Sequence, residues 1–402
     1  MKSSLYIIVL VAILCFSLSA PAGDWPRFRG PNADGISTET GINKAWAERQ
    51  PETLWTFNMS DGGYAGPSVA DGKVFIIDHV GDNDVVRALD LNTGKQVWEY
   101  AYPEPGRPDY GYARSTPTVD GDKVYTLGRL GTLNCLNAKT GQKIWSRNIV
   151  KDFTGQLPKW QLAMSPFIDG NNVILCPGGQ NASVVALKKT TGETVWQGGG
   201  SDKPGYATPV IATLAGKKQY LIFTGFAITG VDPANGKLLW SHPWKTQHDV
   251  NAAAPIQIGP NHVFITSGYG HGCALLKVEP GKVAVEWENK EIVAHFSSSV
   301  LVDGIIYGTG DPGFLTCLDP KTGKALWKKD NFEKGGIIVV DGAIIGLDGR
   351  GGDLIMAEAK PDGYKELGRI KPLGGQSWTA PVPAQGKLLV RNKSTLACLN
   401  LK

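Results

Sequence analysis

A pattern of eleven residues recurs five times in this chain and constrains its fold more than any other feature. Each copy opens with a small residue, carries a glycine six positions later and closes with a tryptophan ten positions after its start. Five matches without gaps along one chain are typical of a repeat architecture, in which each repeat is one supersecondary unit. The copies are ALDLNTGKQVW at 88–98, CLNAKTGQKIW at 135–145, ALKKTTGETVW at 186–196, GVDPANGKLLW at 230–240 and CLDPKTGKALW at 317–327.

Each copy predicts two short strands joined by a tight turn. In the first copy Leu89 and Val97 are apolar and suit strands, whereas Gly94 supplies a turn position that tolerates positive φ. The closing tryptophan is a large plate that can fill the gap between two sheets while its indole N–H donates to a backbone acceptor. We assign this structural docking role to Trp55, Trp98, Trp145, Trp196, Trp240, Trp287 and Trp327.

A second hairpin precedes each tryptophan unit, and Asp-Gly turns such as 71–72 and 120–121 mark most of these hairpins. Each repeat therefore predicts four strands, which form one blade. The fifth repeat is lengthened before Trp287, and the seventh has Leu367 where a tryptophan is expected. Counting both gives eight blades, and seven is the alternative if the seventh repeat is not a full blade.

The two ends of the repeat region complement each other. Residues 53–57 resemble the last strand of a repeat whose beginning is missing, and residues 380–401 supply three strands without the closing one. Sharing one sheet between the two ends closes a ring and removes its open edge. The sequence therefore predicts an all-β chain: an eight-bladed β-propeller of four-stranded antiparallel blades, closed by the N- and C-terminal strands.

We divide the chain into an export signal (1–22), an irregular N-terminal arm (23–50) and the propeller (51–402). Lys2, the apolar run 5–18 and the A-x-A site at 20–22 are typical of a cleaved signal peptide. The apolar run is too short for a stable membrane span, and Leu14 before Cys15 does not fit a lipoprotein signal. We expect an exported protein, periplasmic or extracellular, without a lipid anchor; an uncleaved anchor is the alternative.

The charge of the chain argues against two classes of partner, and its cysteine content argues against a disulfide framework. The formal net charge of +4, without a run of lysine or arginine, does not favour a nucleic-acid or membrane-surface partner. An odd number of cysteines in the mature chain argues against a full disulfide framework. We expect these thiols to be buried as small apolar residues. The five cysteines are Cys135, Cys176, Cys273, Cys317 and Cys398.

Strand parity predicts which face of the ring binds. The first and third turns of each repeat emerge on one face and are short; the second turn and the connection to the next repeat emerge on the other. The second face carries long segments, including 100–113, 146–163 and 241–251, and binding residues concentrate in loops on rigid scaffolds. Candidates on this long-loop face are Tyr110, Arg114, Trp160, Trp244, His248, Asn251, His271, His295 and Trp378.

Each candidate also has a purely structural interpretation, in which it packs a loop or hydrogen-bonds at the channel mouth. The pairs His248 with Asp249 and His271 with Cys273 lack the spacing of a zinc site, so we predict no metal site. The chain contains no nucleophile elbow, P-loop or dinucleotide-binding glycine motif. We therefore assign no catalytic residue.

The repeated motif resembles the tryptophan-docking repeats of the quinoprotein, or PQQ-type, β-propellers over nearly the whole mature chain. The nearest resemblance is to secreted bacterial PQQ-binding-like, or BamB-like, propeller-repeat proteins. Their N-terminal arm resembles DWPRFRGPN at 24–32, and segments like PWKT at 243–246 and HFSS at 295–298 recur among them. The motif is specific for the fold and weak for activity, because one fold hosts many functions.

This resemblance implies two functions. Quinoprotein dehydrogenases oxidise alcohols or sugars with PQQ and a Ca²⁺ ion that needs carboxylate ligands; many also have adjacent cysteines, which this chain lacks. BamB-type propellers are non-catalytic and bind an outer-membrane assembly partner through their loops. We expect a monomeric scaffold of the second kind, with an envelope or secreted protein as partner and no cofactor. A PQQ- and Ca²⁺-dependent alcohol or sugar dehydrogenase is the alternative, and glycan binding is a third reading.

Overall fold

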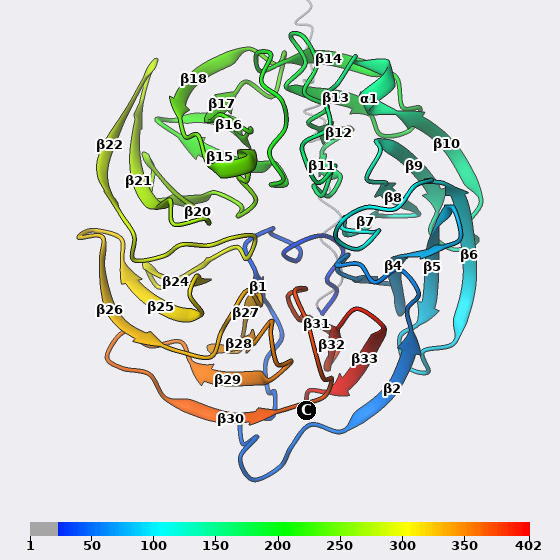
Figure 1. Ribbon diagram of the computed structural model, residues 1–402, viewed down its shortest axis with the longest axis vertical. Helices are drawn as coiled ribbons and strands as arrows, with labels where there is room; N and C mark the ends of the chain where they lie inside the picture. Colours follow the sequence, from blue (N-terminus) through cyan, green and yellow to red (C-terminus); the bar gives the residue numbers. More distant parts are fainter. Residues whose placement is uncertain (1–22) are drawn as a thin grey trace, which may run out of the picture.

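The computed structural model describes residues 23–402, which form eight antiparallel sheets around a central axis (Figure 1). The predicted eight-bladed propeller is therefore confirmed. The predicted export signal lies outside the described residues. No helix within residues 23–402 has the length and apolar character needed to cross a membrane.

Each blade has four strands, termed A to D from the central axis outward. Blade 1 contains β3 (Ser68–Ala70), β4 (Lys73–Val80), β5 (Asn83–Asp90) and β6 (Gln96–Pro103). Blade 2 contains β7 (Thr118–Asp120), β8 (Lys123–Leu127), β9 (Thr132–Asn137) and β10 (Lys143–Asn148). Blade 3 contains β11 (Phe167–Asp169), β12 (Asn172–Leu175), β13 (Val184–Lys188) and β14 (Thr194–Gly198). Blade 4 contains β15 (Val210–Leu214), β16 (Lys217–Phe223), β17 (Ala227–Val231) and β18 (Leu238–Pro243).

The second half of the ring continues this order. Blade 5 contains β19 (Ile256–Ile258), β20 (His262–Ser267), β21 (Gly272–Glu279) and β22 (Lys282–Asn289). Blade 6 contains β23 (Val300–Val302), β24 (Ile305–Gly310), β25 (Phe314–Asp319) and β26 (Lys324–Lys329). Blade 7 contains β27 (Ile337–Val340), β28 (Ala343–Leu347), β29 (Leu354–Glu358) and β30 (Glu366–Ile370), and β1 (Ile36–Ser37) pairs in parallel with β27. Blade 8 contains β31 (Val382–Ala384), β32 (Lys387–Arg391), β33 (Thr395–Asn400) and β2 (Thr53–Asn58).

Two short helical segments lie in connections: α1 (Ile149–Asp152) follows β10, and η1 (Gln247–Asp249) follows β18. The burial of each strand depends on its position in the blade. Every residue of β28, a B strand, is buried because neighbouring blades cover both faces of the sheet. The D strand β26 alternates between exposed and partly buried residues because its outer edge faces solvent.

The predicted hydrogen bond of the docking tryptophan to the next blade forms at six of the seven positions. In each, the indole Nε1 donates to a backbone carbonyl oxygen in the C–D turn of the next blade, over 2.8–3.1 Å. The pairs are Trp55 with Leu91, Trp98 with Ala138, Trp145 with Lys189, Trp196 with Pro233, Trp287 with Pro320 and Trp327 with Lys360.

Trp240 departs from this arrangement. Its indole Nε1 donates to Gln219 Oε1 within its own blade, not to a backbone carbonyl. In blade 5 four residue pairs follow the Leu275–Trp287 pair toward the C–D turn, whereas in blade 1 one pair follows Ala88–Trp98. The lengthened hairpin of blade 5 therefore carries its turn beyond the reach of the Trp240 indole.

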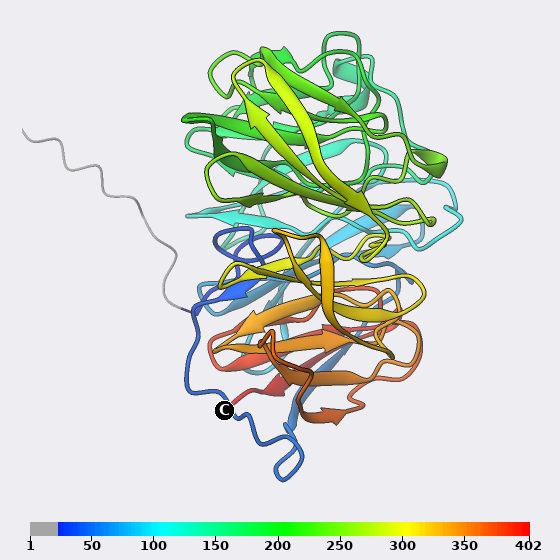
Figure 2. The same ribbon diagram turned by 90° about the vertical axis from the view of Figure 1, so that its left-hand side faces the viewer.

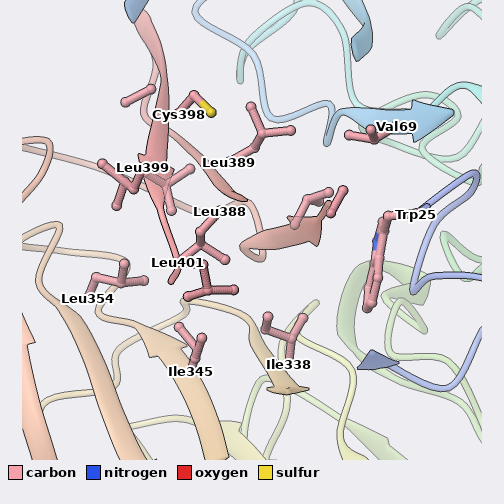
Figure 3. Close-up of a cluster of buried hydrophobic side chains, with 14 of the residues drawn as sticks. Trp25, Val69, Ile338, Ile345, Leu354, Leu388, Leu389, Cys398, Leu399 and Leu401 are labelled. Atoms are coloured by element: carbon pink, nitrogen blue, oxygen red, sulfur yellow. The ribbon is translucent and has the colours of Figure 1, made fainter. Parts of the chain in front are cut away.

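The seventh blade obtains its tryptophan from the N-terminal arm. The prediction that Leu367 holds the docking position is wrong by one residue, because Leu367 is the bulged residue and Gly368 pairs with Met356. Trp46 is fully buried, and a Cβ on Gly368 would lie 2.7 Å from the Trp46 Cβ. Trp46 belongs to the same buried cluster as the strands of blades 7 and 8, part of which Figure 3 shows. A side chain distant in sequence thus fills the gap that Gly368 leaves.

The terminal strands close the ring in blade 8, where β2 pairs antiparallel with β33 and Trp55 lies opposite Cys398. Closure is reinforced by a buried ion pair, in which Arg391 Nη2 donates to Asp61 Oδ1 at 2.9 Å with both side chains fully buried. The five predicted cysteines are all buried, and none within residues 23–402 forms a disulfide.

Residues 23–50 cross the central channel. Trp25 pairs with Val69 of strand β3, and the carbonyl of Pro26 accepts from the Val119 N–H of β7. The same segment bonds to A–B turns: Asp24 accepts from Gln385, and Lys44 pairs with Asp341 at 3.2 Å. Figure 2 shows it along one face of the ring. The arm therefore covers the short-turn face of the channel and leaves the long-loop face open.

Candidate functional site

The channel opens on the long-loop face into a cavity of about 390 Å³. Its deep end contains Trp25, Phe28 and Arg29 of the N-terminal arm. Its walls come from the starts of the A strands and from the connections between blades, which meet at the axis because each connection leads from an outer D strand to the next inner A strand. Ring closure and the arm together produce a pocket with one mouth.

Aromatic rings form a nearly continuous wall around this cavity. Tyr64 stacks on Trp378 with ring centroids 4.9 Å apart, and the tilted ring of Phe296 contacts Trp378 at 5.2 Å. Farther round, Tyr269 and Trp160 lie almost parallel at 6.5 Å, with an angle of 8° between their planes. The further contacts in this wall are His295 with Phe296, Tyr269 with His295, Tyr110 with Trp160 and Trp160 with Tyr206.

The charged groups that line the cavity are cations. They are Arg29, Arg114 and Lys334, and the lining contains no aspartate or glutamate. Arg29 donates to the carbonyls of Ala33, Asp34 and Ser299 and is satisfied by the backbone. The Lys334 ammonium lies 5.9 Å from the centroid of the Trp378 ring. An excess of positive charge inside an apolar wall favours a ligand that carries negative charge.

Arg114 has unused hydrogen-bonding capacity. Its Nη2 donates to the carbonyls of Tyr110 and Gly111, the latter at 3.2 Å, whereas its buried Nη1 has no partner. Burial, with a smaller contribution from Arg129, lowers the pKa of Arg114 to about 10, so the guanidinium stays charged at neutral pH. A desolvated cation with a free donor is a suitable partner for an anionic oxygen.

The structure brings together five of the nine predicted binding residues at this cavity: Tyr110, Arg114, Trp160, His295 and Trp378. Exposed His248 lies at the rim, where its ring meets Trp160 edge-on at 5.3 Å. Burial lowers the pKa of His295.

The other three predicted residues pack loops. Trp244 Nε1 donates to Ser267 Oγ at 3.0 Å, and Ser267 donates to Asn251 Oδ1 at 2.8 Å. Asn251 is fully buried and also donates to the carbonyls of Thr224 and Trp244. His271 meets the Trp244 ring edge-on at 4.3 Å and does not line the cavity. Their geometry favours the structural interpretation.

Several cavity residues were missed from the sequence. They are the deep residues Trp25, Phe28 and Arg29, and the wall residues Tyr64, Tyr206, Tyr269, Phe296 and Lys334. A signal existed for Tyr64 and Tyr206, because each stands, like the predicted Trp378, three residues before a proline that directly precedes an A strand. The deep residues had no such signal, since only the folded arm places them in the channel.

The cavity does not fit the calcium ion of quinoprotein dehydrogenases. Ca²⁺ takes six to eight oxygen ligands, with carboxylates prominent among them. The residues that line this cavity include no carboxylate. Across residues 23–402, no three His, Cys, Asp or Glu side chains are grouped to hold a metal ion. We therefore derive no reaction step through PQQ and Ca²⁺ at this site.

A separate buried group of titratable residues lies beneath the connection from blade 1 to blade 2. His79 Nδ1 lies 2.7 Å from Asp84 Oδ1, and Tyr102 donates to Asp84 Oδ2 at 3.3 Å. Burial and, to a smaller extent, the charge of neighbouring Asp84 raise the pKa of Glu104 to about 7. Asp84 and Glu104 are fully buried. We interpret this group as structural, and the raised pKa of Glu104 should make the stability of the fold depend on pH.

Comparison with known proteins supports the resemblance seen in the repeats. BamB of Yersinia pestis is 24% identical over 374 residues, which cover 89% of this chain and 80% of that protein. The quinohemoprotein alcohol dehydrogenase of Comamonas testosteroni is 28% identical over 191 residues, only 26% of its length. Its crystal structure superposes with a TM-score of 0.69 at 15% identity, covering 96% of this chain and 81% of that one.

The crystal structure of BamB from Moraxella catarrhalis superposes with a TM-score of 0.63 at 16% identity and covers 87% of this chain and 99% of that one. Structural likeness at such low identity shows the shared fold and does not separate the two functions. The sequence profile of the family described as "Outer membrane protein assembly factor BamB" matches residues 39–109 and 82–329. These matches span more than half of the chain, which therefore belongs to this BamB-like family of PQQ-type β-propellers.

Proposed function

We propose that this protein is an exported scaffold that binds a partner protein of outer-membrane assembly through its long-loop face. The named function of its BamB relatives supports the choice of partner. The position of exposed apolar side chains supports the choice of face. We place the protein in the cell envelope and include no resident cofactor in the proposal.

The single observation that carries this proposal is the uneven distribution of exposed large apolar residues. Within residues 23–402 these residues lie on outer D strands, in B–C and D–A connections or at the strand ends beside a B–C connection, and none lies in an A–B or C–D turn. Exposed apolar side chains that cluster on one face mark interaction surfaces. On the long-loop face they are Val80, Tyr110, Leu157, Phe226, Tyr269 and Phe314.

Site-specific photocrosslinking in the cell envelope tests this proposal. A crosslinking residue at Tyr110 or Phe226 should capture a component of the outer-membrane assembly machinery. The same residue at exposed Lys139 in a C–D turn is the matched control and should capture none. Equal capture at both faces, or capture only at Lys139, would refute the assignment of the binding face.

Titration with PQQ and Ca²⁺ tests the absence of a cofactor. The scaffold proposal predicts no stoichiometric binding and no alcohol- or sugar-dependent dye reduction. Saturable binding accompanied by dye reduction would replace the scaffold proposal with an oxidoreductase. The lack of carboxylates around the cavity argues for the first outcome.

A further inference from the structure

We propose that the central cavity binds a small acidic saccharide, with the acidic group on Arg114 and a sugar ring against the aromatic wall. Such binding is separate from the partner-protein role, because it uses the interior of the channel and not the exposed loop tips. The inference rests on charge, on the aromatic wall and on the hydrogen-bond donors that line the cavity.

Charge selects an anion. Arg114 and Lys334 face the cavity, and neither forms an ion pair with a carboxylate of the described chain. The Arg114 Nη1 is buried and unpaired, which costs free energy unless an acceptor from a ligand reaches it. A carboxylate oxygen of a ligand can accept a charge-assisted hydrogen bond from this Nη1.

The wall selects a ring with apolar faces. Tyr64 and Trp378 present stacked rings, and Trp160 and Tyr269 present nearly parallel ones. Aromatic rings offer large, rigid contact area at low entropic cost. The C–H faces of a pyranose can cover such rings while the hydroxyl groups at its edge point away from them.

Hydroxyl donors favour a saccharide over a flat aromatic acid. Ser165 Oγ accepts the Thr116 N–H, Thr208 Oγ1 accepts the Ser165 N–H and Ser298 Oγ accepts the Ala254 N–H, each at 2.9 Å. All three hydroxyls line the cavity, and none donates to another group of the described chain. Their hydrogens remain free for the oxygen atoms around the edge of a sugar. A simple aromatic acid such as benzoate has acceptors only on its carboxylate and would leave these donors unmatched.

The cavity also has a suitable size and depth. Its volume of about 390 Å³ lies within the range of roughly 300–1,000 Å³ that is typical of small-molecule sites. The arm closes its deep end, so a ligand enters and leaves through the long-loop face.

Isothermal titration calorimetry of the full mature chain at low salt tests this inference. The probes are glucuronate and a short galacturonate oligomer, with glucose as neutral control and benzoate as aromatic acid. We expect saturable binding of an acidic sugar, at least tenfold weaker binding of glucose and benzoate, and weakening as salt is added. No saturable binding of either acidic sugar, equal binding of glucose, or preferential binding of benzoate would overturn the proposal.

Variants locate the site. Arg114→Gln should weaken binding of the acidic sugar about tenfold or more, whereas Lys139→Gln removes a positive charge on the opposite face and should leave it unchanged. Lys334→Gln provides a second test if Arg114→Gln does not fold, as judged by circular dichroism. Unchanged affinity in a folded cavity variant would overturn the assignment. Lys334→Gln should retain the crosslinks from Phe226, so failure here is distinguishable from failure of the scaffold proposal.

Discussion

The contribution of tryptophan docking to stability can be measured by substituting two glycines that lie in C–D turns of different blades. Gly94 and Gly281 have nearly the same backbone angle, φ +69° and +72°. An added Cβ at Gly94 would lie 2.6 Å from Cδ2 and Cε3 of Trp55, whereas a Cβ at Gly281 would meet no atom within 4 Å. Alanine at either position costs about 1–2 kcal/mol for positive φ. Only Gly94→Ala also overpacks a tryptophan, which costs a further ~1–3 kcal/mol.

Gly94→Ala should therefore lower the free energy of unfolding by roughly 2–5 kcal/mol and Gly281→Ala by about 1–2 kcal/mol. Chemical denaturation followed by tryptophan fluorescence and by circular dichroism measures both variants, and agreement between the two probes checks that unfolding is cooperative. Equal destabilisation by the two variants would show that the turn conformation alone accounts for the loss. The proposed contribution of Trp55 docking would then be refuted.

Three further predictions concern buried groups. Trp46→Ala should lower the free energy of unfolding by about 3–5 kcal/mol in chemical denaturation, because it leaves a cavity between blades 7 and 8; a loss below ~1 kcal/mol would contradict the wedge role. Glu104 keeps its proton to about pH 7 in the folded protein and releases it near pH 4.5 when unfolded, so stability should fall by up to ~3 kcal/mol from pH 4.5 to pH 7. Glu104→Gln should abolish that fall in denaturation series at the two pH values, and an unchanged slope would refute the assignment. Arg391→Met should cost about 3–5 kcal/mol by leaving Asp61 buried without a partner, and adding Asp61→Leu should restore part of it in a double-mutant cycle.

The repeat motif predicted most of the fold because each copy contains its own turn and its own docking plate. Asp-Gly and Thr-Gly turns are local signals, and the pairing of 53–57 with the C-terminal strands followed from counting incomplete repeats. Trp46 could not be predicted in the same way. Its position depends on a bulge that places Gly368, not Leu367, opposite Met356, and on an arm without periodicity.

The candidate site was predictable in its face and only partly in its residues. Strand parity identifies the long-loop face, but whether a loop side chain points into the channel depends on packing between loops. Trp244 and Asn251 were selected by residue type and are held in a buried network. Tyr206 and Lys334, which do line the cavity, lie in the connections 199–209 and 330–336, which were not among the long segments identified from the sequence.

Closure of the ring also determines when this protein can mature. Strand β2 is made early, but its partner β33 follows the other seven blades in the chain. Blade 8 can thus form only after those seven blades have been synthesised, and contacts so distant in sequence form slowly. Until then β2 presents an unpaired strand, a target for aggregation. A closed ring therefore leaves the nascent chain open to aggregation until the strands of its last blade are complete.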